Sequence, residues 1–233
     1  MEAKYKRVLL KVSGEAIAKN GTGIDPDGLA KVAEEVRQLR AMGVEVGIVV
    51  GGGNFWRGRT SEGMDRCTAD QIGMLATCMN GLALKDAFRQ AGIPAELMAA
   101  FEVTQMCRPF NTEAARKLLS EGTVVIFTGG TGHPFFSTDT GAALRAIEIQ
   151  ADVILLAKNV DAVYDSDPAK NPNARKYSSI THTEVLEKDL KVMDSTAASL
   201  CRDNGMKIHV FGLKEPNAII RACSGEEIGT IVY

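Results

Sequence analysis

Short aliphatic runs alternate with amphipathic segments along nearly the whole chain of 233 residues. The run 44–50 is apolar at almost every position, which indicates a strand buried on both faces, as in a parallel sheet. The segment before it carries Asp25 and Pro26 at its start, apolar residues at helical spacing, and Gly43 at its end, which predicts a capped helix. This alternation predicts an α/β fold, a three-layer αβα sandwich with a mainly parallel central sheet.

The same reasoning gives the remaining elements. Strands are expected at 7–12, 44–50, 94–100, 123–127, 153–157, 207–211 and 230–232, and helices at 26–42, 69–90, 111–119, 139–149, 183–204 with a break near Met193, and 216–223. The segment 162–179 holds two prolines and many polar residues, so we expect a hairpin or excursion there. In the long helix we expect the apolar side chains to pack in the core: Met74, Leu75, Met79, Leu82 and Phe88.

Composition excludes several classes of protein. The length suits one domain spanning 1–233, and the net charge of -2 gives no general footprint for nucleic acid. No apolar run approaches the roughly 18 residues of a membrane span, and 8–10 is too short for the core of a signal peptide. The five cysteines are odd in number and widely spaced, which favours buried thiols in a reducing cytoplasm over disulfides or a zinc site.

Glycine-rich turns follow four of the predicted strands. They are Lys11-Val12-Ser13-Gly14, Gly51-Gly52-Gly53-Asn54, Gly129-Gly130-Thr131-Gly132 and the weaker Phe211-Gly212. Glycine lets consecutive backbone N–H groups approach a ligand and point the same way, which is how such turns bind phosphate. Because the connections of a parallel sheet are right-handed, these turns are expected to meet at one edge.

Several well-known catalytic motifs are absent from the sequence. There is no GxxxxGK[ST] phosphate loop, no GxGxxG dinucleotide fingerprint and no GxSxG nucleophile turn. His182 and His209 fall in or near predicted elements and are expected to be structural, whereas His133 lies within a glycine turn and is a candidate ligand contact.

Charged residues near these turns are candidates for handling phosphate. Lys11 is unusual in an apolar strand, because a buried cation needs a partner such as phosphate, and Arg57 follows the GGG turn. Asp139 is equally explained as a helix cap, and Asp70 and Asp194 as solvated helical charges. From the residues alone, the chain reads as a phosphate-binding α/β enzyme, a phosphotransferase whose acceptor is not identified.

The motifs resemble one family closely. The Lys11–Ala16 segment, the GGGN turn with Arg57 and the segment 74–83 resemble the bacterial UMP kinases (uridylate kinases) of the amino-acid kinase superfamily. So do the stretch 130–139, GTGHPFFSTD, and the Leu190-Lys191-Val192-Met193-Asp194 motif. The resemblance runs from about residue 6 to 230, and 130–139 is its most discriminating part. It implies the amino-acid kinase fold and transfer of the ATP γ-phosphate to UMP, giving UDP and ADP, in pyrimidine nucleotide biosynthesis.

The resemblance also implies roles for individual residues. Lys11 would neutralise charge on the transferring group, and Asp194 would orient the catalytic cations. ATP would contact Lys11, Val12, Ser13, Gly14, Gly53, Arg57, Lys158, Asn159, Tyr164 and Asp167. UMP would contact Gly52, Arg57, Asp70, Thr131, Gly132, His133, Pro134, Phe135, Phe136, Ser137 and Thr138. The part up to about residue 150 would then serve the acceptor and 151–233 would serve ATP.

Mg²⁺ is expected through the nucleotide phosphates, without a metal site made of side chains. The family resemblance further implies a homohexamer, GTP activation and UTP inhibition, and it relates one segment to GTP: Asn20, Gly21, Thr22, Gly23, Ile24 and Asp25. His133 stands where the family has asparagine. Two alternatives stay open: a kinase that makes an acyl phosphate from glutamate or carbamate, and a nucleotide-sensing protein without catalysis, similar to molybdate-storage proteins.

Overall fold

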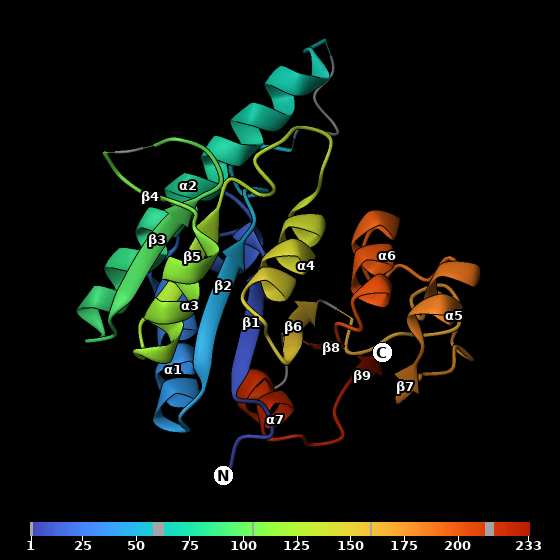
Figure 1. Ribbon diagram of the computed structural model, residues 1–233. Coiled ribbons are helices and arrows are strands. Elements are labelled where there is room, and N and C mark those ends of the chain that lie inside the picture. The colour runs from blue at the N-terminus through green and yellow to red at the C-terminus, as the bar shows by residue number, and fades with distance from the viewer. Residues whose placement is uncertain (1, 58–62, 104, 159, 213–216) are drawn as a thin grey trace.

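The computed structural model describes residues 2–57, 63–103, 105–158, 160–212 and 217–233 (Figure 1). In these residues a nine-stranded sheet has the order β4-β3-β5-β2-β1-β6-β8-β9-β7. The strands are β1 (Arg7–Val12), β2 (Glu45–Val50), β3 (Ala95–Ala99), β4 (Arg108–Pro109), β5 (Val124–Thr128), β6 (Val153–Lys158), β7 (Ser179–Ile180), β8 (Ile208–Gly212) and β9 (Thr230–Val232). Neighbouring strands are parallel except for the antiparallel pair β8 and β9.

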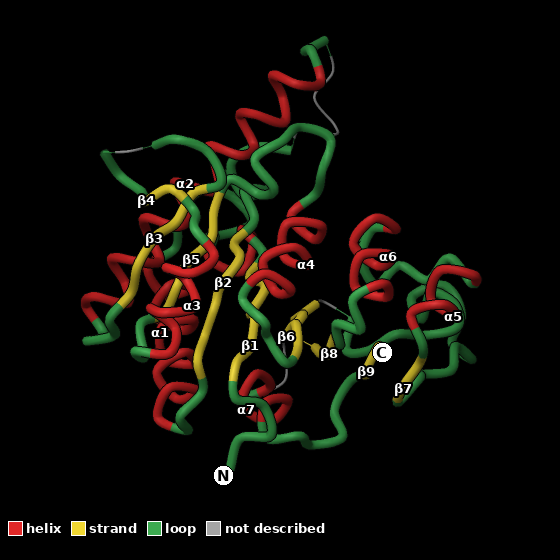
Figure 2. The backbone as a smooth tube through the Cα atoms, viewed as in Figure 1, coloured by secondary structure: helices red, strands yellow, loops and turns green. Residues whose placement is uncertain are grey.

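Helices cover both faces of this sheet, as the tube view also shows (Figure 2). They are the 3₁₀ turn η1 (Gly14–Ile17), α1 (Pro26–Ala41), α2 (Arg66–Gln90), α3 (Thr112–Ser120), α4 (Thr138–Glu148), α5 (His182–Glu187), α6 (Ser195–Asp203) and α7 (Ala218–Cys223). On one face of the sheet, α1 contacts both α2 and α7. Helices α3 and α4 lie on the opposite face, where α6 packs against α4 and α5 packs against α6. The predicted αβα sandwich is therefore confirmed.

Two cores lie on either side of the sheet, because alternate residues of each strand face opposite ways. In β1, Val8 and Leu10 belong to the core under α1, whereas Leu9 belongs to the core under α4. Lys11 follows Leu9 in this alternation, so its side chain faces the α4 layer at the carboxyl end of the strand. The central strands are buried nearly throughout, as their continuous apolar runs predict.

Most predicted boundaries hold to within three residues, and the capping predictions explain why. The Asp25 carboxylate accepts a hydrogen bond from the Asp27 amide at the start of α1, and Asn111 caps α3. The predicted break in 183–204 is the connection 188–194 between α5 and α6. An antiparallel bridge between Tyr164 and Lys176 confirms the hairpin.

The prediction for the apolar side chains of α2 is largely wrong. Leu75 is 52% exposed, Met79 is 47% exposed and Leu82 is 37% exposed, whereas Phe88 is buried as expected. The positions that α2 turns toward the sheet include small ones such as Gly81, where an added Cβ would lie 2.5 Å from the Thr128 Cγ2. Close approach to the sheet therefore selects small residues, and the larger apolar side chains point outward.

Short elements escaped prediction because they span too few residues to carry a period. These are η1, β4 and β7. No helix in the described part of the chain combines the length and the apolar character that crossing a bilayer requires.

Candidate active site

Strand β1 lies at the point where the order of the sheet reverses. The chain passes from β1 to β2 on one side, and β6 later joins the other side of β1. Ligands of open α/β sheets bind outside the carboxyl ends of the strands at such a point. The turns after β1, β2 and β5 leave from this edge, beside the projecting amino-terminal part of α2 (Figure 1), and β6, which runs parallel to β1, ends at the same edge. Three of the four glycine-rich turns therefore meet as predicted, and the fourth, after β8, is described only as far as Gly212.

One cavity at this edge, of about 380 Å³, lies between α2 and the turns after β2 and β5; we call it the α2 cavity. Nine of the residues predicted to bind nucleotide line it: Gly52, Gly53, Arg57, Asp70, Thr131, His133, Phe136, Ser137 and Thr138. Gly132, Pro134 and Phe135 belong to the same 129–137 turn but lie outside this lining. Segments nearly ninety residues apart thus converge on one cavity.

Asp70 is the acidic residue of the α2 cavity. Its carboxylate accepts hydrogen bonds from Arg66 Nε and from the Phe135 amide, each at 2.8 Å. The Arg66 guanidinium also lies 5.3 Å from the centre of the Phe135 ring. Asp70 therefore holds the tip of the 129–137 turn against α2, with a carboxylate that is only 13% exposed.

The glycine-rich turns after β2 and β5 rest directly on α2. An added Cβ at Gly52 would lie 2.8 Å from the Gly73 carbonyl oxygen and 2.9 Å from Ala76 Cβ, so only glycine fits there. The Thr77 hydroxyl accepts a hydrogen bond of 2.8 Å from the Gly129 amide. One face of α2 thus positions the turns after both β2 and β5.

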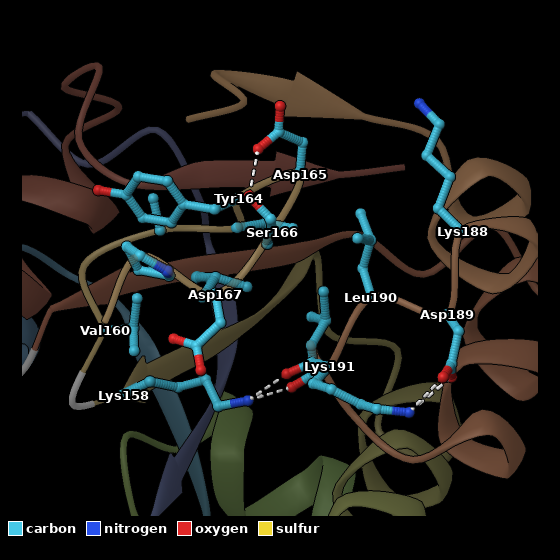
Figure 3. Close-up of a pocket in the computed structure, with 15 residues that line it drawn as sticks. Lys158, Val160, Tyr164, Asp165, Ser166, Asp167, Lys188, Asp189, Leu190 and Lys191 are labelled. Carbon is cyan, nitrogen blue, oxygen red and sulfur yellow. Dashed lines mark hydrogen bonds and ion pairs between the residues drawn. The ribbon is translucent and has the colours of Figure 1, made fainter. Parts of the chain in front are cut away.

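A second cavity, also of about 380 Å³, lies between the 160–168 hairpin arm and the 188–192 connection; we call it the hairpin cavity (Figure 3). Lys158, Tyr164 and Asp167 line it, as does the apolar Val163. Asn159 lies outside the described residues. The Lys158 ammonium donates to the backbone carbonyls of Lys191, at 2.9 Å, and Val192 (Figure 3). Burial is the main cause that lowers the pKa of Lys158, and neighbouring Asp139 opposes this.

Lys11 and Asp139 form an ion pair, and neither residue lines the α2 cavity or the hairpin cavity. The Lys11 Nζ lies 3.1 Å from Asp139 Oδ1, and the two side chains are only 17% and 24% exposed. Asp139 also affects the pKa of Lys158, so one carboxylate neighbours both cations. The cap of α4 is Ser137, not Asp139, which leaves the Asp139 carboxylate free to serve Lys11. The charged partner that an apolar strand demands for Lys11 is thus supplied by the protein itself.

Asp194 lies at the amino end of α6 and holds the start of α4. Its carboxylate accepts from the Ala197 amide at 3.0 Å, from the Thr140 hydroxyl at 3.1 Å, and from the Ser137 hydroxyl. Its hydrogen-bond partners are therefore hydroxyls and an amide at helix ends. Since Asp139 follows Ser137 directly, Asp194 fixes the element that carries the partner of Lys11.

The turn after β1 is held by local contacts. The Val12 carbonyl accepts a hydrogen bond from the Gly51 amide at 2.9 Å. The Ser13 hydroxyl caps η1 by accepting from the Ala16 amide at 3.2 Å, and Gly14 is buried. Arg57, on the turn after β2, forms an ion pair with Glu15. The turns after β1 and β2 are therefore joined by a backbone hydrogen bond and by an ion pair.

The 20–25 segment, predicted as an effector region, is a mostly exposed loop next to these turns. Asn20, Gly21 and Thr22 form its tip, with a bridge between Lys19 and Thr22. The Gly23 amide donates to the Asn54 carbonyl at 3.3 Å, and Asp25 caps α1. Ile24 is 40% exposed. The loop thus contacts the end of the GGGN turn.

Two of the three histidines have the structural role that the sequence predicts. His182 and His209 are buried, with Nε2 of each 2.8 Å from a backbone carbonyl, so both are structural. Burial is the main cause that lowers the pKa of both. His133 is exposed and lines the α2 cavity.

Sequence reasoning missed several residues of the site. Trp56, Arg66 and Thr77 line the α2 cavity without a predicted role there, and Met74, expected in the core, lines it as well. Arg66 and Thr77 lie four and seven residues from Asp70 and could have been found from that helical spacing. Asp139 was explained as a cap, and no pattern in the sequence joins it to Lys11.

Comparisons with known proteins agree with this geometry. The model of the amino acid kinase family matches residues 6–212. A solved UMP kinase from Bacillus anthracis is 39% identical, with a TM-score of 0.94, covering 98% of this chain and 96% of that one. A UMP kinase from Ureaplasma parvum is 38% identical, with a TM-score of 0.92 and coverage of 98% and 99%. A uridylate kinase from Archaeoglobus fulgidus is 28% identical, with a TM-score of 0.72 and coverage of 97% and 99%.

The resemblance drawn from the sequence motifs is therefore confirmed over nearly the full length of both the chain and the solved structures. The fold, the convergence of the glycine-rich turns at one edge and the matched family model all indicate the same family. The chain belongs to the amino acid kinase family.

Proposed function

We propose that the protein is a UMP kinase that transfers the γ-phosphate of ATP to UMP, giving UDP and ADP, in pyrimidine nucleotide synthesis. The observation that carries this proposal is the likeness to two UMP kinases at 39% and 38% identity over nearly the whole chain. Two cavities, one lined by Thr138 next to Asp139 and the other by Lys158, suit a reaction that joins two nucleotides end to end near the Lys11–Asp139 ion pair.

In this proposal UMP occupies the α2 cavity. Asp70 would bind the ribose of UMP, and Gly52 and Arg57 would bind its phosphate. The segment 131–138 would contact the base at Thr131 and the phosphate at Thr138. Thr138 is the first residue of α4, whose backbone N–H groups favour an anion. Arg57 would exchange its exposed ion pair with Glu15 for the phosphate, which offers bidentate acceptors.

ATP then occupies the hairpin cavity. Tyr164, Asp167 and Lys158 would hold its adenosine end, with Asn159 beside them, and the backbone from Val12 to Gly14 with Gly53 would hold its phosphates. The linings of the two cavities divide near residue 150, which supports a single domain whose first part serves the acceptor and whose part 151–233 serves the adenosine end of ATP. The phosphates of ATP would be held by backbone of the first part.

Phosphoryl transfer demands alignment and charge neutralisation more than covalent help. Lys11 would stabilise the charge on the transferring group, with Asp139 fixing the ammonium 3.1 Å away. Asp194 would act by holding Ser137 and Thr140, and thereby the amino end of α4. No histidine is needed as a base, which agrees with the burial of His182 and His209.

Mg²⁺ fits this site as a cation bound mainly by phosphate oxygens. In the described part of the chain, no group of three or more His, Cys, Asp and Glu side chains is arranged to hold a metal. Mg²⁺ commonly binds through substrate phosphates and one or two carboxylates, and Asp139 is the carboxylate beside Lys11. When bound, Mg²⁺ would neutralise phosphate charge.

The remaining proposals concern assembly and regulation. We propose a homo-oligomer, a hexamer by family resemblance, with GTP as an activator, UTP as an inhibitor and a cytoplasmic location. The exposed apolar side chains of α2 support assembly, and the five free thiols suit a reducing compartment. The contact of Gly23 with Asn54 gives the 20–25 loop a connection to the phosphate turns.

An ADP-release assay with UMP, CMP, glutamate and carbamate as acceptors tests the proposal against its alternatives. UMP is expected to be turned over most efficiently, whereas an acyl-phosphate kinase would use glutamate or carbamate. The single tryptophan, Trp56, lines the α2 cavity, so its fluorescence reports acceptor binding independently of turnover. Binding of UMP without turnover of any acceptor would favour a nucleotide sensor and overturn the assignment.

A further inference from the structure

Two buried asparagines face each other beneath the GGGN turn. Asn80, on α2, is fully buried, and Asn54, at the end of the turn, is 4% exposed. Asn80 Nδ2 donates to Asn54 Oδ1 at 2.7 Å, and Asn54 Nδ2 donates to Asn80 Oδ1 at 3.0 Å. The two amides thus form a reciprocal pair that uses the donor and the acceptor of each.

The second donor hydrogen of each amide binds a backbone carbonyl outside the pair. Asn80 Nδ2 donates to the Gly51 carbonyl at 2.6 Å, and Asn54 Nδ2 donates to the Gly23 carbonyl at 2.6 Å. The pair therefore joins α2, the first glycine of the turn after β2, and the 20–25 loop. These three segments are not neighbours in sequence.

Gly14, in the turn after β1, also packs against the asparagine pair. An added Cβ at Gly14 would lie 2.2 Å from Asn54 Oδ1 and 3.0 Å from the Gly51 carbonyl oxygen. The backbone of the first phosphate turn therefore packs directly against the amide pair. A shift of Asn54 would displace Gly14 and Gly51 together.

The chemistry of the pair explains why asparagine stands at both positions. Each side chain has to donate two hydrogen bonds and accept one within a single planar group, which an amide does and a carboxylate or an alkyl group does not. Leaving one of these buried groups unpaired is unfavourable, because the group loses its bonds to water without gaining a partner. Gly51 is therefore held in one position, and Gly52 and Gly53, which follow it in sequence, line the α2 cavity.

We propose that Asn80 and Asn54 are positioning residues that fix the turns after β1 and β2 relative to each other, so that both present their backbone to the phosphates of the two nucleotides. This inference rests on the proposed UMP kinase function. Neither side chain would touch substrate; both act through Gly14 and Gly51.

The substitution Asn80→Asp tests the proposal through pH. An ionised carboxylate has no hydrogen to donate and would repel the Gly51 carbonyl and Asn54 Oδ1, whereas the protonated form regains one donor and keeps an acceptor. We expect kcat/KM for UMP at pH 8 to fall at least tenfold relative to wild type, because small misplacements of binding groups cost this much. The ratio of variant to wild type should rise severalfold at pH 6, since burial raises the pKa of a carboxyl group.

His182→Asn is the matched control. It changes another buried side chain that is hydrogen-bonded to a carbonyl, that of Met206, on an element outside the two phosphate turns. We expect it to lower the melting temperature while leaving kcat, the KM for UMP and the pH profile within twofold of wild type. Circular dichroism at each pH would establish that every variant is folded.

Asn54→Ala repeats the test from the other member of the pair and is also expected to lower kcat/KM at least tenfold. Folded variants at Asn80 and Asn54 with wild-type kcat/KM and pH profile would overturn the proposal. So would failure of both variants to fold, because the pair would then serve global stability. If wild type does not phosphorylate UMP but uses another acceptor, the proposed function fails, and the variants are compared on that acceptor.

Discussion

Lys11 shows how one charged side chain is accommodated in a buried strand. It occupies a position on β1 that faces the α4 layer, and Asp139 provides the opposite charge 3.1 Å away. A partly buried ion pair of this kind restricts the orientation of the lysine side chain. Lys11 lines neither proposed nucleotide cavity, but its partner Asp139 follows Thr138 of the α2 cavity and also influences the pKa of Lys158 in the hairpin cavity. The ion pair therefore suits the stabilisation of a phosphate in transfer.

Lys11→Ala is expected to lower kcat at least 100-fold, because a cation that acts in the transition state would be lost. Steady-state kinetics with ATP and UMP measure this, and Trp56 fluorescence checks that UMP still binds. The control is Lys6→Ala, which removes an exposed lysine next to the other end of the same strand. Near-normal turnover of Lys11→Ala would refute the role.

Asp70 gives a second prediction at the scale of one residue. Asp70→Ala is expected to raise the KM for UMP about tenfold or more while leaving the KM for ATP nearly unchanged, because it loses the proposed ribose contact and releases Phe135 from α2. Varying each substrate at saturating concentrations of the other separates the two constants. Asp86→Ala, an exposed acid on the same helix, serves as the control. An unchanged KM for UMP would remove Asp70 from the site.

At the scale of elements, α2 has two different faces. The face toward the sheet contacts the glycine-rich turns after β2 and β5 through Gly73, Ala76, Thr77 and Asn80. The opposite face exposes larger apolar side chains, which soluble monomers rarely gather on one helix. The same helix thus positions the proposed site and offers a surface for assembly.

A double substitution on the exposed face of α2 tests the proposed self-association. Leu75→Glu with Met79→Glu should shift the protein toward smaller species, because two charges would oppose burial of this face. Sedimentation velocity at matched concentrations measures the shift. Lys117→Glu with Ser120→Glu alters two exposed residues of α3 and should leave the oligomeric state unchanged. Identical distributions for wild type and the α2 variant would place any interface elsewhere.

At the scale of the whole molecule, two buried histidines connect stability to pH. Burial lowers the pKa of His182 and of His209 below the ordinary value near 6.5. The unfolded chain therefore binds protons that the folded chain does not, so this stability is fully present above about pH 6.5 and is lost as pH falls. Each histidine contributes a slope of up to about 1.4 kcal/mol per pH unit below that point.

Urea unfolding of wild type at pH 7.5 and pH 5.5, at one protein concentration, should show the lower stability at pH 5.5. In His182→Asn the loss between these two pH values should be smaller by up to about 1.4 kcal/mol, since one titrating group is gone. Comparing the change within each protein removes the general cost of the substitution. An equal loss in both proteins would mean that His182 contributes nothing to the pH dependence.

The sequence by itself determined the order of the longer strands and helices, the caps at Asp25 and Asn111, and the glycine turns at the strand ends. These features depend on residues within a few positions of one another, so periodicity and turn chemistry reveal them. The resemblance of its motifs to those of known proteins then identified the amino acid kinase family. The path of 162–179 was also predictable, because its prolines and polar residues exclude another strand and helix.

Only the tertiary structure decided which distant side chains meet. Lys11 pairs with Asp139, far along the chain, and Asn54 pairs with Asn80 because α2 packs beneath the turn after β2. The outward direction of Leu75 and Met79 likewise follows from how closely α2 approaches the sheet. Local sequence encodes the elements through short-range periodicity, whereas these contacts arise from packing between elements, which leaves no periodic trace in the chain.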